Sequence, residues 1–386
     1  MVSAAWQTVA LSDFVRLKRG FDLPTHGRTH GSYPVVGSAG ISGWHSQGPI
    51  KGPGVVVGRS GSSMGHVTYV DRDFWPLNTA MFVEDFFSND PRYVAHVLSQ
   101  LDFSSFNSGS AQPSLNRNFI ARVPVTVPPV HEQRAIAEVL GALDGKVTLN
   151  EQICENSFAL ADCYSNSVHG DGGAVSRATV GQLVTGGQLE FGDGYRTKRD
   201  EHGQPGLPIL RVAEVADGEI RPSFADYVRD EFRAVMGRKT SQAGDVVLTT
   251  KGTVGRVALM AADAPEFVYS PQVCYFRIKP DAQLSNIYLF HWMRGPEFWR
   301  QAAGMKGQTD MADYLSLGDI KSLRITLPSR AALAEFDRKC APLHARSAAA
   351  RAENRTLADL RDTLLPQLLS GKLRVRDAVR AVEEVV

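Results

Sequence analysis

A strand–proline–helix segment that occurs twice constrains the fold of this chain more than any other feature. RVPVTVPP (122–129) and SLRITLPS (322–329) both read as short alternating strands that run into proline and then into a long helical stretch. Upstream, GVVVGRSGSSMGHVTYV (54–70) and DVVLTTKGTVGRVALM (245–260) both predict a strand, a glycine-containing turn and a second strand. The chain is therefore predicted to be a duplicated unit with pseudo-twofold symmetry, in which a mixed α/β globule precedes one long helix.

Both helical stretches carry apolar or small residues at alternating steps of four and three. The first series runs from Ile136 to Val168, and the second runs from Leu333 to Leu368. Both series are much longer than an ordinary globular helix of about 11–12 residues. The spacing is that of heptads with polar interruptions, which predicts a coiled coil.

Composition places the chain among ordinary globular proteins. It has 386 residues, of which 43% are hydrophobic and 22% charged, and its net charge of +1 argues neither for nor against nucleic acid. The longest apolar runs fall short of the roughly 18 residues of a membrane span, and the N-terminus lacks the pattern of a signal peptide. We therefore expect a cytoplasmic location. The four cysteines show no CxxC spacing, which indicates reduced, mostly buried thiols and no zinc site.

Motifs of catalysis are not found in the sequence. A methyltransferase acting on an exocyclic amine should carry Asn/Asp-Pro-Pro-aromatic, and VPPVH (127–131) has neither the amide nor the aromatic residue. The phosphate-binding pattern GxxxxGK[ST] does not occur, and GRSGSSMG (58–65) is typical of a hairpin turn. His26 and His30 lie four residues apart in a glycine-rich context that argues against a helical metal site. We predict no cofactor, no metal and no enzyme activity for the chain by itself.

Several short motifs resemble those of the specificity subunits of type I restriction–modification enzymes, in that family's order. They are YPVVGSAGISGW (33–44), GRSGSSMG (58–65), LNTAMFV (77–83), AQPSLN (111–116), VPPVHEQRAIAEVLGALD (127–144), LPILRVAEV (207–215), KGTVG (251–255) and TLLPQLLSGKL (363–373). The resemblance covers nearly the whole chain. The longer GMKGQTDMADYLSLGDI segment and the ending of the first helix depart from the family pattern.

The resemblance implies an α+β chain with two target-recognition domains that are separated by an antiparallel two-helix coiled coil. The expected segments are a first recognition domain at 1–130, a first spacer helix at 131–170, a second recognition domain at 171–330, a second spacer helix at 331–371 and a C-terminal tail at 372–386. It also implies double-stranded DNA with a bipartite target, two methyltransferase subunits docked on the helices, and restriction subunits in the full complex.

Polar loops that mix basic side chains with amides are candidates for reading DNA, because Arg pairs with guanine and Gln or Asn with adenine. The candidates in the first domain are Arg16, Lys18, Arg19, Arg28, Trp44, Lys51, Arg59, Ser60, His66, Gln112, Asn116 and Arg117. The candidates in the second domain are Tyr195, Arg196, Lys198, Arg199, Lys251, Thr253, Arg256, Lys306 and Gln308. For any single member a solvated loop side chain is the simpler explanation, so the prediction applies to the set.

The heptads also predict a register. Paired residues in an antiparallel coil have numbers with a constant sum, and a sum of 504 places Asn150 opposite Asn354. Two facing Asn side chains bond each other, whereas one buried Asn alone is costly. The overlap 136–168 spans about 48 Å at 1.5 Å per residue, or roughly 14 base pairs. The half-sites should therefore be centred about one helical turn or slightly more apart.

Two other functions remain open from the sequence. The chain could be an adapter whose coiled coil and globules bind proteins, in which case it shows no sequence-selective DNA binding even with a methyltransferase present. It could also be a solitary DNA adenine methyltransferase, which the missing motif argues against and which would bind S-adenosylmethionine alone.

Overall fold

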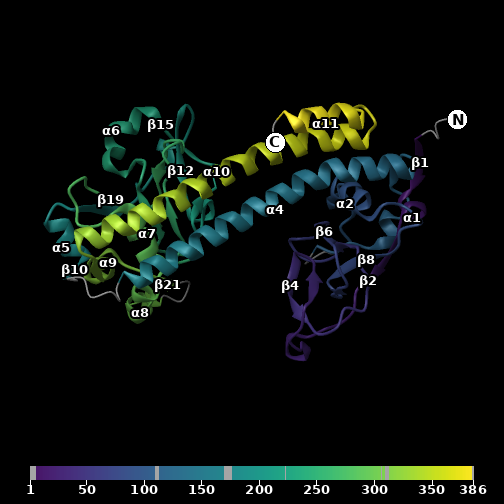
Figure 1. Ribbon diagram of the computed structural model, residues 1–386. Helices are drawn as coiled ribbons and strands as arrows, with labels where there is room; N and C mark the ends of the chain where they lie inside the picture. The colour runs from purple at the N-terminus through teal and green to yellow at the C-terminus, as the bar shows by residue number, and fades with distance from the viewer. Residues whose placement is uncertain are drawn as a thin grey trace. The chain divides into compact units, whose positions relative to one another are not determined.

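The computed structural model describes residues 6–108, 113–168, 176–221, 223–305, 307–308 and 313–384. Gln112 and Lys306 lie outside these ranges, and Gln308 is described by its backbone alone. The chain divides into two compact units. Unit 1 comprises residues 1–150 and 352–386, and unit 2 comprises residues 151–351, so each unit takes in parts of both long helices (Figure 1).

Unit 1 is built on a four-stranded antiparallel sheet in the order β2–β8–β5–β6. These strands are Arg16–Arg19, Ala80–Asp85, Gly54–Gly58 and Val67–Val70. A second sheet has the order β4–β3–β7, with strands Gly40–His45, Tyr33–Gly37 and Trp75–Pro76. A ribbon pairs β1 (Gln7–Ala10) with β9 (Pro124–Val127). The short helices are α1 (Leu11–Phe14), η1 (Thr25–Gly27), α2 (Pro91–Ser99), η2 (Ser104–Phe106) and α3 (Arg117–Ile120).

Unit 2 has the same plan with additions. Its main sheet has the order β11–β19–β16–β17, with strands Leu189–Asp193, Val273–Ile278, Val246–Thr249 and Val257–Leu259. Its second sheet has the order β15–β12–β18, with strands Tyr227–Arg229, Gly206–Leu210 and Val268–Tyr269. A ribbon again pairs β10 (Ser176–Thr179) with β22 (Arg324–Leu327). In chain order, β9 and β22 each lead directly into one of the two long helices.

The remaining elements of unit 2 are short. The helices α5 (Val180–Thr185), α7 (Asn286–Arg294) and α9 (Leu317–Ser322) match α1, α2 and α3 in chain order. The additions include α6 (Arg233–Met236), α8 (Pro296–Met305) and the hairpins β13–β14 (Val215–Ala216, Glu219–Ile220) and β20–β21 (Gly307–Gln308, Asp313–Tyr314). The 3-10 turns are η3 (Arg199–Glu201), η4 (Val212–Glu214), η5 (Asp230–Phe232) and η6 (Gly237–Lys239). The prediction of a duplicated α/β unit is confirmed.

Polar side chains cap the first turns of α2 and α7. Asp90 accepts hydrogen bonds from the backbone N–H groups of Arg92 and Tyr93, both at 3.0 Å, and Pro91 occupies the first turn of α2. Ser285 caps α7 in the same way by accepting from the N–H of Tyr288 at 3.1 Å. These side chains satisfy donors that a helix start leaves without partners.

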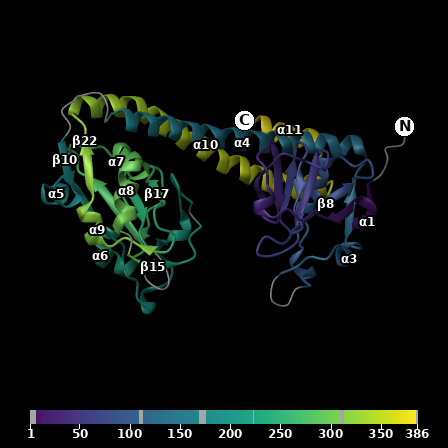
Figure 2. The same cartoon turned by 90° about the horizontal axis from the view of Figure 1, so that it is seen from below.

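The two long helices are α4 (Val130–Ser167) and α10 (Arg330–Leu369). They lie side by side in both views (Figures 1 and 2) and run antiparallel, since Asp144 contacts Arg361 while Cys154 contacts the carbonyl of Ser347. After Gly371 the chain forms α11 (Val375–Glu383), a helix in the segment expected to be a tail. Ala378 of α11 is buried in the core of unit 1.

Each core joins the sheet, the short helix that covers it and the long-helix seam. In unit 1, Val55 and Val57 of the sheet pack with Tyr93 and with seam residues such as Leu140. In unit 2, Val246 and Phe276 pack with Tyr288 and with Phe336 of α10. Burial of each such large side chain contributes about 1.5–3 kcal/mol. Among the described residues, no helix is both long and apolar enough to cross a membrane.

Candidate nucleic-acid interface

The turn that follows β5 in unit 1 and the turn that follows β16 in unit 2 are built alike. In unit 1, the Leu115 N–H donates to the carbonyl of Arg59 at 2.7 Å, and Ser60 forms an isolated antiparallel β-bridge with Ser114. In unit 2, the Leu315 N–H donates to the carbonyl of Thr250 at 3.0 Å, and Lys251 forms an isolated antiparallel β-bridge with Tyr314. Arg59 and Ser60 therefore occupy the positions of Thr250 and Lys251, so equivalent places in the two units carry different side chains.

A second turn of unit 1 lies against this one. The hydroxyl of Ser38, in the β3–β4 turn, donates to the carbonyl of Thr79 at 2.5 Å, and the Ser60 N–H approaches the Ser38 hydroxyl at 3.4 Å. Because Gly61 and Gly65 have positive φ angles of 79° and 85°, the β5–β6 turn reverses tightly there. The turns predicted from separate motifs are thus brought to one edge of the unit.

The structure gathers five of the predicted residues of unit 1 around one cavity of about 640 Å³. They are Lys18 and Arg19 of β2, Arg59 after β5, and Asn116 and Arg117 at the start of α3. Asp22 supplies a carboxylate to the same lining and accepts a hydrogen bond from Asn78. The cavity is therefore strongly basic, as a phosphate- or guanine-contacting surface requires.

The basic side chains of this cavity differ in the hydrogen bonds and ion pairs that they make within the protein. Arg117 donates to the carbonyl of Leu17 at 3.1 Å, and Arg19 donates to the carbonyl of Asn78 at 3.3 Å. Lys18 pairs with Glu84 at 2.7 Å. The guanidinium of Arg59 has no hydrogen-bond or ion-pair partner among the described residues. Arg59 is therefore the side chain best placed to bind an external acceptor.

The other candidates of unit 1 lie outside the cavity. Arg28 donates to the carbonyl of Ser42 at 2.9 Å. Arg16 lies 4.0 Å from Asp85. Lys51 pairs with Asp73 at 2.7 Å, and this hydrogen bond raises the pKa of Lys51. His66 is exposed just before β6. Trp44 on β4 is 51% exposed, and Ile41 on the same edge strand is 55% exposed.

In unit 2, the first predicted loop follows β11. Tyr195 is held by a backbone hydrogen bond to the carbonyl of Tyr269 at 2.7 Å, and burial together with Glu201 raises the pKa of its hydroxyl. Lys198 lies 4.0 Å from Glu201. Arg196 and Arg199 are exposed and have no ion pair within the described parts of the chain. These two arginines are available to a ligand.

The second predicted loop of unit 2 joins β16 to β17. Lys251 and Thr253 are exposed there, next to Gly252 with φ of 79°. Arg256 instead donates to the carbonyls of Val212 and Val215 at 3.3 and 3.1 Å. Its guanidinium holds η4 against the sheet, so its contacts are structural.

No group of three or more His, Cys, Asp or Glu side chains could hold a metal ion in the described ranges. Three cysteines are buried and Cys163 is exposed, and burial raises the pKa of Cys274 to about 12. Basic loops and turns distinguish this surface.

Comparison with known proteins identifies the class of chain that carries these loops. The family model described as the type I restriction modification DNA specificity domain matches residues 4–156. The EcoprrI specificity subunit of Escherichia coli is 26% identical over 164 residues, which cover 41% of this chain and 40% of that relative. The MjaVIII specificity subunit of Methanocaldococcus jannaschii is 19% identical over 297 residues, 72% of this chain and 69% of the relative. This chain is similar to the specificity subunits of type I restriction–modification enzymes.

The chain matches only about two fifths of the length of the E. coli specificity subunit. Its fold is similar over a longer range to the S subunit of a type I restriction–modification system from M. genitalium. That crystal structure superposes with a TM-score of 0.59 at 16% sequence identity, over 94% of this chain and 96% of the other. The fold of this chain is therefore similar to that of this S subunit over nearly the whole length of both chains.

Reasoning from sequence missed two features of this surface. Ile41 is exposed beside Trp44, although the alternation GISGW offered no reason to place an isoleucine in solvent. Ser38 connects two turns through Thr79, and this connection depends on a contact between segments 41 residues apart. A local pattern contains no signal for either feature.

Proposed function

We propose that the chain is the non-catalytic specificity subunit of a type I restriction–modification complex and reads a bipartite double-stranded DNA target, one half-site with each α/β domain. The observation that supports this most is the pair of equivalent turns with unlike side chains, Arg59-Ser60 in unit 1 and Thr250-Lys251 in unit 2. Equivalent scaffolds that present different donors and acceptors suit two different base sequences.

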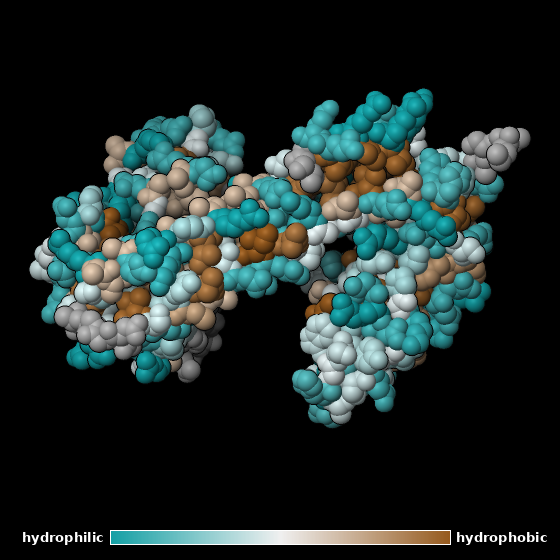
Figure 3. All heavy atoms as spheres, in the orientation of Figure 1, coloured by the Kyte–Doolittle hydropathy of each residue, from teal (hydrophilic) through white to brown (hydrophobic). Residues whose placement is uncertain are grey.

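Two methyltransferase subunits dock on the long helices in this proposal, and restriction and translocase subunits complete the complex. Helix α4 exposes Leu149 to 52% in unit 1 and Leu160 to 44% in unit 2. Figure 3 shows apolar residues on the visible surface of the long helices. Exposed leucines on a helix favour association with another apolar surface.

The length of the helix pair sets the distance between half-sites in this proposal. Seven matched residues inserted in both helices add about 10 Å at 1.5 Å per residue. The DNA spacer should then lengthen by roughly 3 base pairs. A spacer that stays unchanged in the methylated target would contradict this part of the proposal.

Methylation in the host tests the proposal directly. Sequencing of modified adenines with the gene present and with it deleted should reveal one bipartite motif that disappears on deletion. Replacement of residues 1–125 by the matching part of a relative should then change one half-site only. The adapter alternative predicts no change in methylation, and a solitary methyltransferase would methylate without any partner.

A further inference from the structure

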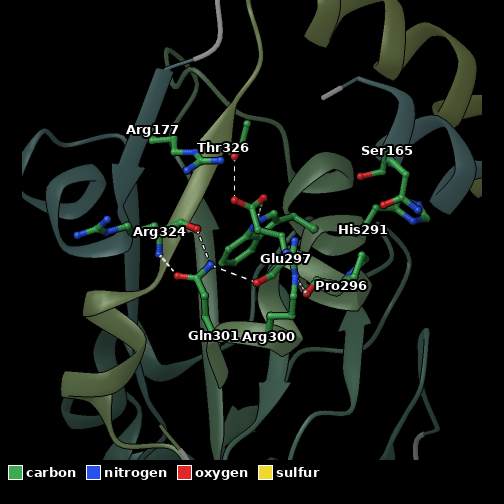
Figure 4. Close-up of a pocket in the computed structure, with 12 residues that line it drawn as sticks. Ser165, Arg177, His291, Pro296, Glu297, Arg300, Gln301, Arg324 and Thr326 are labelled. Atoms are coloured by element: carbon green, nitrogen blue, oxygen red, sulfur yellow. Dashed lines mark hydrogen bonds between the residues drawn. The ribbon is translucent and has the colours of Figure 1, made fainter. Parts of the chain in front are cut away.

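Unit 2 contains an arginine-lined cavity that lies apart from the candidate DNA loops. Its volume is about 680 Å³, and Arg177, Arg300 and Arg324 lie in its wall (Figure 4). Arg300 donates to the carbonyl of Pro296 at 3.2 Å. None of the three guanidinium groups has an ion-pair partner among the described residues, whereas Arg211, Arg277 and Arg294 of the same unit are all paired with carboxylates.

The carboxylate that lines this cavity is engaged by neutral donors. Glu297 accepts hydrogen bonds from the Trp292 indole N–H at 2.9 Å and from the Thr326 hydroxyl at 2.8 Å. Gln301 is also fixed, because its amide donates to the carbonyl of Arg324 at 2.8 Å and accepts from the Arg324 N–H at 2.8 Å. These hydrogen bonds fix Glu297 and Gln301 in the lining of the cavity (Figure 4).

The register of the ribbon explains why two arginines flank one cavity. Arg177 is opposite Thr326, and Thr179 is opposite Arg324. Because strand residues two apart share a face, Arg177, Arg324 and Thr326 all lie on the same face of the β10–β22 ribbon. Figure 4 shows Arg177 reaching toward Thr326 and Arg324 extending outward from the strand.

The duplicate in unit 1 provides an internal comparison. In its β1–β9 ribbon, Thr8 is opposite Thr126 and Ala10 is opposite Pro124. Thr8 and Pro124 therefore occupy the places of Arg177 and Arg324. The cavity there is smaller, about 280 Å³, and apolar, and its wall includes Val97, Leu101, Val125, Pro366 and Leu369. Among the described residues, the ribbon of unit 1 has no basic side chain at these two places.

We propose that the arginine-lined cavity of unit 2 receives carboxylate side chains of an acidic segment of the protein partner that docks on the helix pair. The inference rests on the proposed docking of methyltransferase subunits. Arg forks bind carboxylates in a bidentate manner, which suits a cavity whose three guanidinium groups have no ion pair in the described ranges. The last turn of α4 contributes Ser165 and Asn166, and its dipole of about half a charge opposes an anion only weakly against three full charges.

The position of α8 favours a protein partner over DNA. Glu297, Arg300 and Gln301 of α8 face the cavity, whereas Trp299 of the same helix packs against Gly255 in the β16–β17 turn. The helix therefore stands between the cavity and the turn that carries Lys251 and Thr253. A DNA duplex read by that turn meets the other side of α8.

One consequence concerns two identical partner subunits. Because the equivalent place in unit 1 has no arginine, only the partner copy on unit 2 makes this charged contact. Rising salt should therefore weaken the binding of that copy more steeply than the binding of the copy on unit 1, since ion pairs at a partly open surface are screened.

The test uses the full chain, co-purified with its methyltransferase subunit, and the double variant Arg177→Gln/Arg324→Gln. Native mass spectrometry and binding titrations across salt concentrations should show about tenfold or greater weakening of the unit 2 copy. Arg177→Lys/Arg324→Lys should fall between. The control Arg122→Gln/Arg238→Gln removes two exposed arginines outside the cavity and should leave assembly unchanged.

The outcomes separate this inference from the proposed function. Equal assembly of wild type and Gln variant, with equal thermal unfolding midpoints, overturns the inference. Unchanged assembly with weaker binding to every DNA sequence assigns the arginines to DNA phosphates and also overturns it. If the wild-type chain fails to assemble with a methyltransferase subunit, the proposed function itself is wrong.

Discussion

The side-chain amide of Asn150 on α4 donates a hydrogen bond to the side-chain oxygen of Asn354 on α10 at 2.9 Å. Asn150 is only 2% exposed, and Asn354 in turn donates to the carbonyl of Val147 at 3.2 Å. This is the amide pair expected from the heptad register. The bond between the buried Asn150 and the partly buried Asn354 disfavours alternative registers, because a shift separates the two amides.

Substitution of one member of this pair should cost more than substitution of both. Asn354→Leu leaves the buried Asn150 without one acceptor and should lower the free energy of unfolding by about 1–3 kcal/mol. The double variant with Leu at both positions should be close to wild type, because apolar pairs satisfy a coiled-coil seam. Urea unfolding measures both values, and equal destabilisation by the single and double variants would contradict the argument.

Oxidation of Asn150→Cys/Asn354→Cys should crosslink the two helices. The matched control is Leu149→Cys/Asn354→Cys, in which the first cysteine is one residue away on the exposed side of α4. Non-reducing electrophoresis after tryptic cleavage distinguishes the two. Equal crosslinking of both pairs would mean that the seam is not held in this register.

Arg59→Gln should alter recognition of one half-site without unfolding the protein. Its guanidinium lines the basic cavity and has no partner in the described part of the chain, so the substitution removes no internal bond. Loss of a bidentate base contact costs about 1–3 kcal/mol in discrimination. Methylation of target variants by the assembled complex measures this loss.

Arg117→Gln is the matched control for Arg59. The Arg117 guanidinium donates to the carbonyl of Leu17 at 3.1 Å, so its loss should lower unfolding stability by about 0.5–1.5 kcal/mol. The base preference of the assembled complex at its target should remain that of the wild type. If Arg59→Gln instead weakens binding equally for all sequences, then Arg59 contacts phosphate rather than a base.

Asp245 anchors a buried charge network in unit 2, and its loss should be strongly destabilising. The side chain is 0% exposed and accepts from Arg277 Nε at 2.8 Å and from the Tyr269 hydroxyl at 2.7 Å. Asp245→Ala removes the closest carboxylate partner of the buried Arg277, which keeps only the ion pair with Glu190 at 3.6 Å, and should cost about 3–5 kcal/mol. Asp193→Ala breaks the half-exposed pair with Lys239 at 3.2 Å and should cost less than about 1 kcal/mol. Comparable losses in the two variants would refute the network's role.

Two histidines in edge-to-face contact should make the stability of unit 2 depend on pH. His291 contacts Asp162 at 2.5 Å and His344 at 2.8 Å, and burial lowers the pKa of His344 to about 3. The unfolded chain therefore binds a proton near its ordinary pKa of 6.5 that the folded chain does not bind. Stability is fully present above pH 6.5 and falls as the pH drops toward 3, by about 1–2 kcal/mol between pH 7 and 5.

The variant His344→Phe tests whether His344 causes this pH dependence of stability. The ring sits among Phe158 and Phe290, with centroids 5.2 and 5.4 Å away, so a phenyl group fits the aromatic cluster. The variant should lose much of the pH dependence between 7 and 5 while remaining folded. A slope identical to wild type would show that other groups control acid unfolding.

The sequence by itself determined the local elements and their duplication. The alternation in RVPVTVPP and SLRITLPS appears as β9 and β22, and the caps at Asp90 and Ser285 start α2 and α7. Heptad spacing also led to the facing amides of Asn150 and Asn354. These features follow from residues close in sequence or from one repeated period, which is why a pattern is enough to predict them.

Only the tertiary structure decided which of the polar loop residues share a surface and which are already engaged. Lys18, Arg59 and Arg117 come from three segments and meet only because β2, β5 and α3 pack together. Arg256 resembles its neighbours in sequence, yet the carbonyls of Val212 and Val215 occupy its guanidinium. The cavity around Arg177 and Arg324 depends on the pairing of strands more than 140 residues apart in the chain. Contacts between distant segments set the availability of each charge, and no local pattern encodes them.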